Sequence, residues 1–155
     1  MALEIEKKFL VDKNKWEAIE KSNRSFIKQG YILTDSHKTI RIRQTDSKSY
    51  ITIKGSNVGA IRPEYEYEIP YEDAEELIDK FAVSSITKIR YIIEYKNKKW
   101  EVDEFLGDNE GLIIAEIELK DENEEFELPE WIGKEVTDIE KYYNSRLSEV
   151  PFKKW

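Results

Sequence analysis

Charged and apolar side chains alternate with a period of two in segments spread along the whole chain. The first segment is Glu4-Ile5-Glu6-Lys7-Lys8, in which Glu4, Glu6 and Lys8 would share one face of a strand, opposite Ile5. Alternation of this kind is typical of β-strands. Its recurrence predicts that many charged side chains converge on one place.

Six further segments repeat the pattern, and in each of them a set of charged side chains shares one parity. They are Arg41 and Arg43 in 38–45, Lys54 in 48–54, Glu64, Glu66 and Glu68 in 64–69, Lys88 and Arg90 in 86–91, Glu101 and Asp103 in 98–105, and Glu116, Glu118 and Lys120 in 112–120. A half-exposed sheet with its charged face in water explains any one strand. It does not explain all the segments together, because like charges two residues apart on one face repel unless a counter-ion lies between them.

Helix signals separate these strands. An N-cap at Asp12 predicts a helix over 13–21, an apolar stripe predicts one over 72–81, and a capping box of Thr137 and Glu140 predicts a last helix to Ser148. The predicted strands cover 2–10, 26–34, 38–45, 48–54, 62–69, 86–96, 98–105 and 112–120.

About eight mostly antiparallel strands and three helices indicate an α+β fold built on a closed or nearly closed β-barrel. The length of 155 residues favours a single domain over 1–155. If the helices cover the outward apolar faces of the strands, the charged faces turn inward.

Composition excludes several kinds of site. The chain has no Cys, which excludes disulfides and thiolate metal sites, and its one His, His37, excludes a histidine-cluster zinc site. A net charge of −8 argues against general nucleic-acid binding. Neither a long apolar run nor a signal peptide is evident, so we expect no membrane partner and a cytoplasmic location.

The inward charges predict what the cavity binds. Eight candidate acids, Glu4, Glu6, Glu64, Glu66, Glu68, Asp103, Glu116 and Glu118, exceed six candidate bases by two negative charges. Such a cavity repels a bare polyanion and attracts one when divalent cations are bound. All-oxygen ligands favour Mg²⁺ or Mn²⁺, with Ca²⁺ as a possible inhibitor. Arg and Lys bind phosphate oxygens, so the combination of carboxylates and cations fits phosphoryl transfer better than glycoside hydrolysis.

An ordered set of motifs carries a family resemblance over nearly the whole chain. The motifs are Glu4-x-Glu6-x-Lys8, Gln29-Gly30-Tyr31-Ile32, Ile40-Arg41-Ile42-Arg43, Thr52-Ile53-Lys54-Gly55, Arg62-x-Glu64-x-Glu66-x-Glu68-Ile69, Lys88-Ile89-Arg90-Tyr91, Val102-Asp103-Glu104-Phe105, Ala115-Glu116-Ile117-Glu118-Leu119 and Glu135-Val136-Thr137. In this order they resemble the CYTH superfamily, the triphosphate tunnel metalloenzymes. The resemblance implies an eight-stranded antiparallel tunnel that binds a triphosphate end-on with divalent metal.

The resemblance also implies roles for individual residues. The metal ligands would be Glu4, Glu6, Asp103, Glu116 and Glu118. The phosphate ligands would be Lys8, Arg41, Arg43, Lys54, Lys88 and Arg90. Glu64 and Glu66 would bind a second metal or position water, and with Glu4, Glu6 and Lys8 they form the catalytic set. Rim or supporting positions would be Lys7, Glu68, Glu101, Lys120 and Lys134, but Lys7 has the opposite parity to Glu6 and is left out of the site.

Reactions differ within the family, and the chain resembles its small bacterial-type inorganic triphosphatases. At this length we expect no second domain. No nucleoside pocket is evident, and the four Trp residues fit packing better than base stacking. Inorganic triphosphate hydrolysis is therefore the leading hypothesis. The alternatives are thiamine or nucleoside triphosphate hydrolysis, adenylate cyclisation, RNA 5′-triphosphate removal, and polyphosphate binding without turnover. The preferred metal and the oligomeric state stay open.

Overall fold

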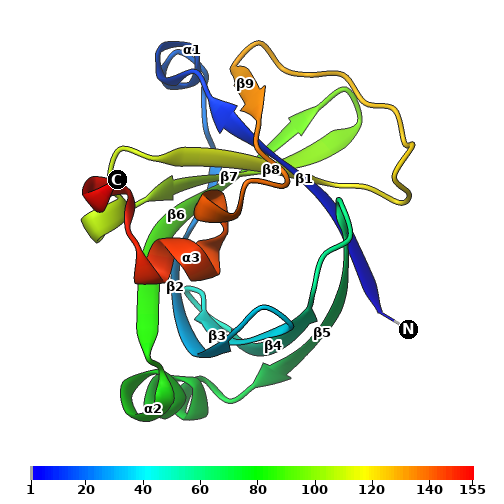
Figure 1. Cartoon of the computed structure of the whole chain (residues 1–155). Helices are drawn as coiled ribbons and strands as arrows, with labels where there is room; N and C mark the ends of the chain where they lie inside the picture. Colours follow the sequence, from blue (N-terminus) through cyan, green and yellow to red (C-terminus); the bar gives the residue numbers. More distant parts are fainter. Residues whose placement is uncertain (1) are drawn as a thin grey trace.

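The computed structural model describes residues 2–155, and eight of its strands close into an antiparallel barrel (Figure 1). The wall strands are β1 (Leu3–Val11), β2 (Asn23–Thr34), β3 (Lys38–Gln44), β4 (Ser49–Gly55), β5 (Ile61–Ile69), β6 (Ser84–Tyr95), β7 (Lys98–Phe105) and β8 (Ile113–Glu118). Around the wall they follow the order β1-β5-β4-β3-β2-β6-β7-β8, and β8 pairs with β1 again. The predicted α+β barrel is confirmed.

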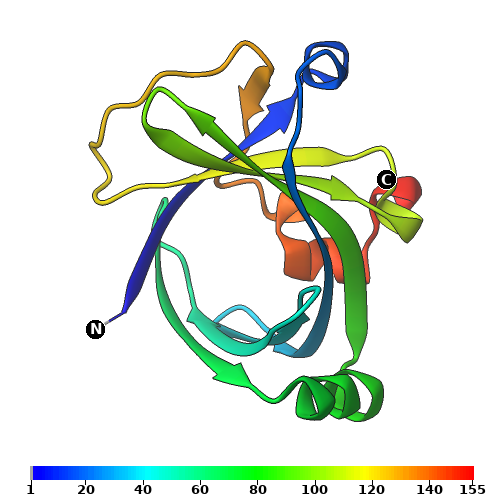
Figure 2. The same ribbon diagram turned by 180° about the vertical axis from the view of Figure 1, so that it is seen from behind.

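The charged parity of the strands faces the inside of the barrel. The antiparallel register places Lys8 opposite Glu116, and Arg90 opposite Asp103. Figure 2 shows the same ring of strands from behind. Charged side chains from seven of these strands line a cavity inside the ring, so the inward direction of most of the charged faces is confirmed.

The largest apolar cluster lies outside the wall. Phe9, Trp100 and Ile117 form its base, and Trp16 of α1 (Lys13–Glu17) and Trp131 cover it. Trp100 is fully buried and lies edge-on to Phe9, with 5.6 Å between the ring centroids. Burial of these large rings against the outer wall stabilises the barrel, because aromatic side chains remove the largest apolar areas from water.

Helix α2 (Tyr71–Phe81) packs against the outer face of β2 and β3. Its Ala74 and Ile78 are buried with Ile42 of β3. The contact is close at Gly30 of β2, where a Cβ atom would lie 2.9 Å from Cγ1 of Ile78. A residue without a side chain therefore lets this helix approach the sheet.

Helix α3 (Asn144–Glu149) departs from the expectation that every helix covers an outward face. It crosses the opening of the ring (Figure 1), and its fully buried Leu147 packs with Tyr31, Ile86 and Ile114. These three residues share the inward parity of their strands. The inward faces of β2, β6 and β8 are therefore apolar at this end, and α3 covers them.

Several element boundaries differ from the sequence prediction. Asp12 does cap α1, accepting from the Lys15 N–H at 3.2 Å, but the helix ends at Glu17. The Thr137 capping box is wrong, because the Thr137 hydroxyl accepts from the Lys8 N–H at 3.1 Å and donates to Glu135 at 2.6 Å. A short strand that was not predicted, β9 (Ile132–Glu135), pairs with the end of β1.

Between β9 and α3 the chain forms a short 3₁₀ turn, Glu140–Tyr142. Two other 3₁₀ turns lie at Gly107–Asn109 and Phe152–Lys154. Across residues 2–155, no helix is long and apolar enough to cross a membrane.

Candidate active site

A cavity of about 270 Å³ lies inside the barrel, and all eight wall strands contribute side chains to it. It gathers twelve of the thirteen predicted site residues: Glu4, Glu6, Lys8, Arg41, Arg43, Lys54, Glu64, Glu66, Lys88, Arg90, Glu116 and Glu118. Asp103 is the exception. It is buried and does not line the cavity.

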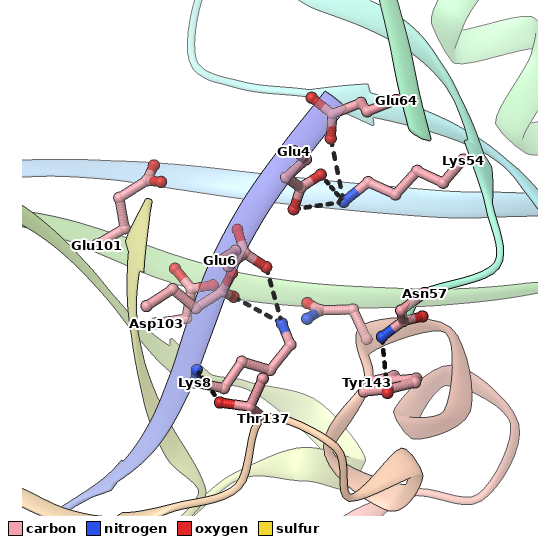
Figure 3. A network of polar contacts seen from close by, with 12 residues as sticks. Glu4, Glu6, Lys8, Lys54, Asn57, Glu64, Glu101, Asp103, Thr137 and Tyr143 are labelled. Carbon is pink, nitrogen blue, oxygen red and sulfur yellow. Dashed lines mark hydrogen bonds and ion pairs between the residues drawn. The ribbon is translucent and has the colours of Figure 1, made fainter. Parts of the chain in front are cut away.

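Two lysines lie between pairs of carboxylates. The Lys8 ammonium is 3.3 Å from Glu6 and 3.2 Å from Glu116. The Lys54 ammonium is 2.8 Å from Glu4 and 3.2 Å from Glu64. Figure 3 shows both lysines pointing toward the carboxylates that β1 carries.

These contacts set the pKa of Lys8. Burial by itself lowers that pKa, but the carboxylates of Glu116, Glu6 and Glu4 raise it above its ordinary value overall. Lys8 is therefore a fixed positive charge inside the barrel.

Asp103 holds two other cations in place. Its carboxylate accepts two hydrogen bonds from Arg90, at 2.8 and 2.9 Å, and lies 2.8 Å from the Lys88 ammonium. Burial would raise the pKa of Asp103, yet Arg90 and Lys88 hold it well below its usual range. Both carboxylate oxygens of Asp103 therefore contact these two cations.

Lys88 is the most buried of the cavity cations. Its ammonium donates to the Asn144 side-chain oxygen of α3 at 2.7 Å, and its side chain is 1 % exposed. Burial lowers the pKa of Lys88, Asp103 opposes this shift, and Arg90 and Arg43 add to it. Helix α3 is therefore part of the site as well as a cover for the barrel.

The carboxylates of β8 repel other carboxylates nearby. Burial raises the pKa of Glu116, and Glu6 raises it further, although Lys8 opposes this. Burial also raises the pKa of Glu118, with Glu4 and Glu6 adding to the shift. Along this side of the cavity negative charge is in local excess, as a cation-binding surface requires.

A preformed set of metal ligands is nevertheless absent from the part of the chain that the structure describes. No three His, Cys, Asp or Glu side chains in residues 2–155 are grouped closely enough to hold a metal ion. The ammonium groups of Lys8 and Lys54 lie between the acids instead.

The sequence of this chain matches the CYTH domain over residues 2–151. The chain belongs to the CYTH domain family. It is 47% identical over 154 residues to an inorganic triphosphatase of Acetivibrio thermocellus, covering 99% of this chain and 97% of that protein. It is 31% identical over 152 residues to an inorganic triphosphatase of Nitrosomonas europaea, covering 94% and 96%. The crystal structure of an inorganic triphosphatase superposes with a TM-score of 0.65 at 30% identity, covering 96% of this chain and 95% of the other.

The charge balance of this CYTH cavity differs from the sequence prediction. Seven carboxylates line it, those of Glu4, Glu6, Glu64, Glu66, Glu101, Glu116 and Glu118. Eight cations line it, those of Lys8, Arg41, Arg43, Lys54, Arg62, Lys88, Arg90 and Lys99. The predicted excess of two negative charges is wrong, because Asp103 and Glu68 lie outside the lining, whereas one further acid, Glu101, and two further cations, Arg62 and Lys99, lie within it.

Strand parity explains the two cavity cations that were missed. Arg62 and Lys99 share the parity of Glu64 and Glu101, so the alternation contained the signal for both. Tyr143 and Asn144 come from outside the strands, and no strand pattern identifies them. Tyr143 accepts a hydrogen bond from the Asn57 side chain at 2.8 Å (Figure 3).

The predicted supporting residues divide into two groups. Glu101 lines the CYTH cavity and pairs with Arg90 at 2.9 Å. Lys7 lies on the outer side, 5.7 Å from the centre of the Phe126 ring. The remaining three, Glu68, Lys120 and Lys134, are exposed and do not line the cavity.

Proposed function

We propose that this chain is a metal-dependent inorganic triphosphatase that hydrolyses triphosphate to diphosphate and phosphate. The observation that carries the proposal is the cavity inside the barrel, where closely spaced arginines and lysines alternate with carboxylates. The similarity to two inorganic triphosphatases along almost their whole length supports the same reaction.

The cations are suited to a chain of phosphates. Arg41 and Arg43 lie on the inward face of β3, and Lys88 and Arg90 lie on the inward face of β6. Guanidinium groups bind phosphate oxygens through paired N–H donors, and ammonium groups add compact positive charge. We assign phosphate binding to Arg41, Arg43, Lys88 and Arg90, together with Lys8 and Lys54.

The carboxylates on β1 and β8 fit a divalent cation. Glu6, Glu116 and Glu118 present only oxygen donors. Burial raises the pKa of Glu116 and of Glu118, and the neighbouring carboxylate of Glu6 raises both further. We assign metal binding to Glu4, Glu6, Glu116 and Glu118, with Mg²⁺ or Mn²⁺ as the ion and Ca²⁺ as an inhibitor. Such an ion supplies positive charge to the phosphate oxygens.

Asp103 fits this metal set less well. Its carboxylate would have to release Arg90 or Lys88 in order to coordinate an ion. We therefore assign Asp103 the role of positioning these two cations.

The chemistry is an in-line displacement. The oxygen of a water molecule attacks the terminal phosphorus, the bond from that phosphorus to the bridging oxygen breaks, and the proton that the water loses passes to the solvent. Negative charge develops on the leaving diphosphate, and fixed cations such as Lys8 and Arg90 stabilise it. Glu64 and Glu66 face the same cavity from β5, where we propose that they orient water or a second ion.

Inorganic triphosphate is favoured over a nucleotide because the cavity offers no platform for a base. Trp16, Trp100 and Trp131 lie in the cluster outside the wall, and the only aromatic side chains lining the cavity within residues 2–155 are Tyr31 and Tyr143. Both tyrosines are close to charged or polar groups. A nucleoside would have to stay outside the charged region.

A panel of substrates tests the proposal. The purified protein is incubated with inorganic triphosphate, ATP or thiamine triphosphate in the presence of Mg²⁺, Mn²⁺ or Ca²⁺, and released phosphate is measured. We expect the fastest release from inorganic triphosphate with Mg²⁺ or Mn²⁺. Formation of cyclic AMP from ATP would instead indicate a cyclase, and tight triphosphate binding without product would indicate a binding module.

A further inference from the structure

Arg62 of β5 lies where the charged cavity meets a second cavity. The second cavity, which we call the outer mouth, is bounded by the segments 34–39 and 55–59 and by α3. Arg62 lines both spaces, as do Thr39, Asn57 and Tyr143. Its guanidinium therefore lies at the entrance from the outer mouth to the charged cavity.

Neutral groups hold Arg62 in this place. Its Nε donates to the Gly55 carbonyl at 2.6 Å, and its Nη2 donates to the Thr39 hydroxyl at 3.2 Å. A guanidinium has five N–H donors, and within residues 2–155 only these two contacts are formed. The remaining donors, including both on Nη1, are available for a ligand.

Arg62 also has no carboxylate within ion-pair distance among the described residues. Five of the cavity cations, Lys8, Arg41, Lys54, Lys88 and Arg90, each have such a partner. Three have none, and of these Lys99 is exposed to solvent, whereas Arg62 and Arg43 are partly buried. A partly buried and unpaired charge is unfavourable unless a ligand of opposite charge binds it.

The two partly buried cations without a carboxylate partner, Arg62 and Arg43, lie at opposite ends of a row of polar side chains. Arg62 touches Thr39, and Thr39, Arg41 and Arg43 follow one another on the inward face of β3. Thr39 and Arg43 are four positions apart along the strand, which is about 13 Å at 3.3 Å per residue. Arg43 in turn is close enough to Arg90 for the two charges to repel. If a linear polyanion lay along this row with one end at Arg43, its other end would lie nearest Arg62.

We propose that Arg62 binds the end phosphate nearest the outer mouth and thereby lets the protein distinguish triphosphate from diphosphate. This inference rests on the proposed function, because it assumes that a triphosphate lies in the cavity. A diphosphate has one phosphate fewer than a triphosphate, so it occupies a shorter part of the row. It binds at the end with three cations, Arg43, Lys88 and Arg90, and leaves Arg62 free.

The decisive variant is Arg62→Gln, which removes the charge and keeps a side-chain donor for the Gly55 carbonyl. We expect its KM for triphosphate to rise about 10-fold or more, as loss of a charge-assisted hydrogen bond predicts, with kcat changed less than about 3-fold. The inhibition constant of diphosphate should change less than about 2-fold. Arg62→Lys should restore most of the lost affinity, because it restores the charge.

Two controls separate the alternatives. Arg24→Ala removes an exposed arginine outside the cavity and should leave all these constants unchanged. If Arg62 only held the segment 55–59 in place, Arg62→Gln would lower the unfolding temperature and weaken both anions equally. That result would overturn the inference, as would an unchanged KM for triphosphate.

Equilibrium dialysis with triphosphate and with diphosphate, in the absence of metal, tests Arg62 independently of turnover. If the wild-type protein releases no phosphate, the proposed function fails, and dialysis still decides whether Arg62→Gln selectively loses triphosphate. Equal loss of both anions, or loss of neither, in that assay contradicts the inference.

Discussion

Asp103 is the residue on which the cationic side of the site depends. Its carboxylate is 1 % exposed and compensates two buried charges, Arg90 and Lys88. A buried charge left without its partner destabilises a fold strongly. Asp103 therefore links the stability of the barrel to the placement of the groups that bind phosphate.

We predict that Asp103→Asn lowers the free energy of unfolding by about 3–5 kcal/mol at neutral pH. Because the folded pKa of Asp103 lies below its ordinary value of 3.8, its stabilising contribution is present above that value and is lost as pH falls further. The difference between variant and wild type should thus shrink from pH 6 to pH 2.5 in urea unfolding. Asp79→Asn, at an exposed position of α2, serves as the control. A difference that stays constant over this range would contradict the prediction.

The clustered carboxylates of β1 and β8 lead to a prediction about metal. A divalent ion bound only by the folded state at 100 times its Kd adds about 2.7 kcal/mol of stability, which for a domain of this size is about 5–10 °C in unfolding temperature. We expect Mg²⁺ or Mn²⁺ to produce such a shift in the wild type. Glu116→Gln should lose most of it, whereas Glu122→Gln, at an exposed position, should keep it. Equal shifts in both variants would refute the assignment of Glu116.

At the scale of elements, α3 has an unexpected role. Sequence periodicity predicted a final helix but began it at Thr137, because Thr137 and Glu140 have capping-box spacing. In the structure Thr137 bonds to β1 and β9, and the helix begins at Asn144. Long-range hydrogen bonds such as the one from Lys8 to Thr137 cannot be read from local spacing. For the same reason β9, whose four residues include a glycine, was missed.

Leu147 tests the contribution of α3 to stability. Its side chain is fully buried against Tyr31, Ile86 and Ile114, so Leu147→Ala should lower the free energy of unfolding by about 2–5 kcal/mol. Val150 follows α3 in the sequence and is 55 % exposed. Val150→Ala should change the free energy of unfolding by less than about 0.5 kcal/mol. Denaturant unfolding of both variants measures the two values. Similar small losses in both would mean that α3 does not anchor the end of the barrel.

At the scale of the whole molecule, strand parity predicted the inside of the barrel well. Alternation assigned twelve cavity residues to the correct face, because the side-chain direction of a strand is fixed by its period of two. What parity does not contain is which inward charges neutralise one another. Asp103 faces inward yet is occupied by Arg90 and Lys88, and Arg62 faces inward yet belongs to no pair of like charges in the sequence. Closure of the barrel also depends on β1 pairing with both β5 and β8, which only the folded chain brings together.

The central claim is that the charged cavity hydrolyses inorganic triphosphate with the help of a divalent ion. Its most direct test is phosphate release from inorganic triphosphate with Mg²⁺ or Mn²⁺, compared between the wild type and Glu6→Gln. We predict rapid release by the wild type and a loss of about 100-fold or more in the variant, with its unfolding transition retained. Absence of release by the wild type under every metal and pH condition, or full activity in Glu6→Gln, would contradict the account.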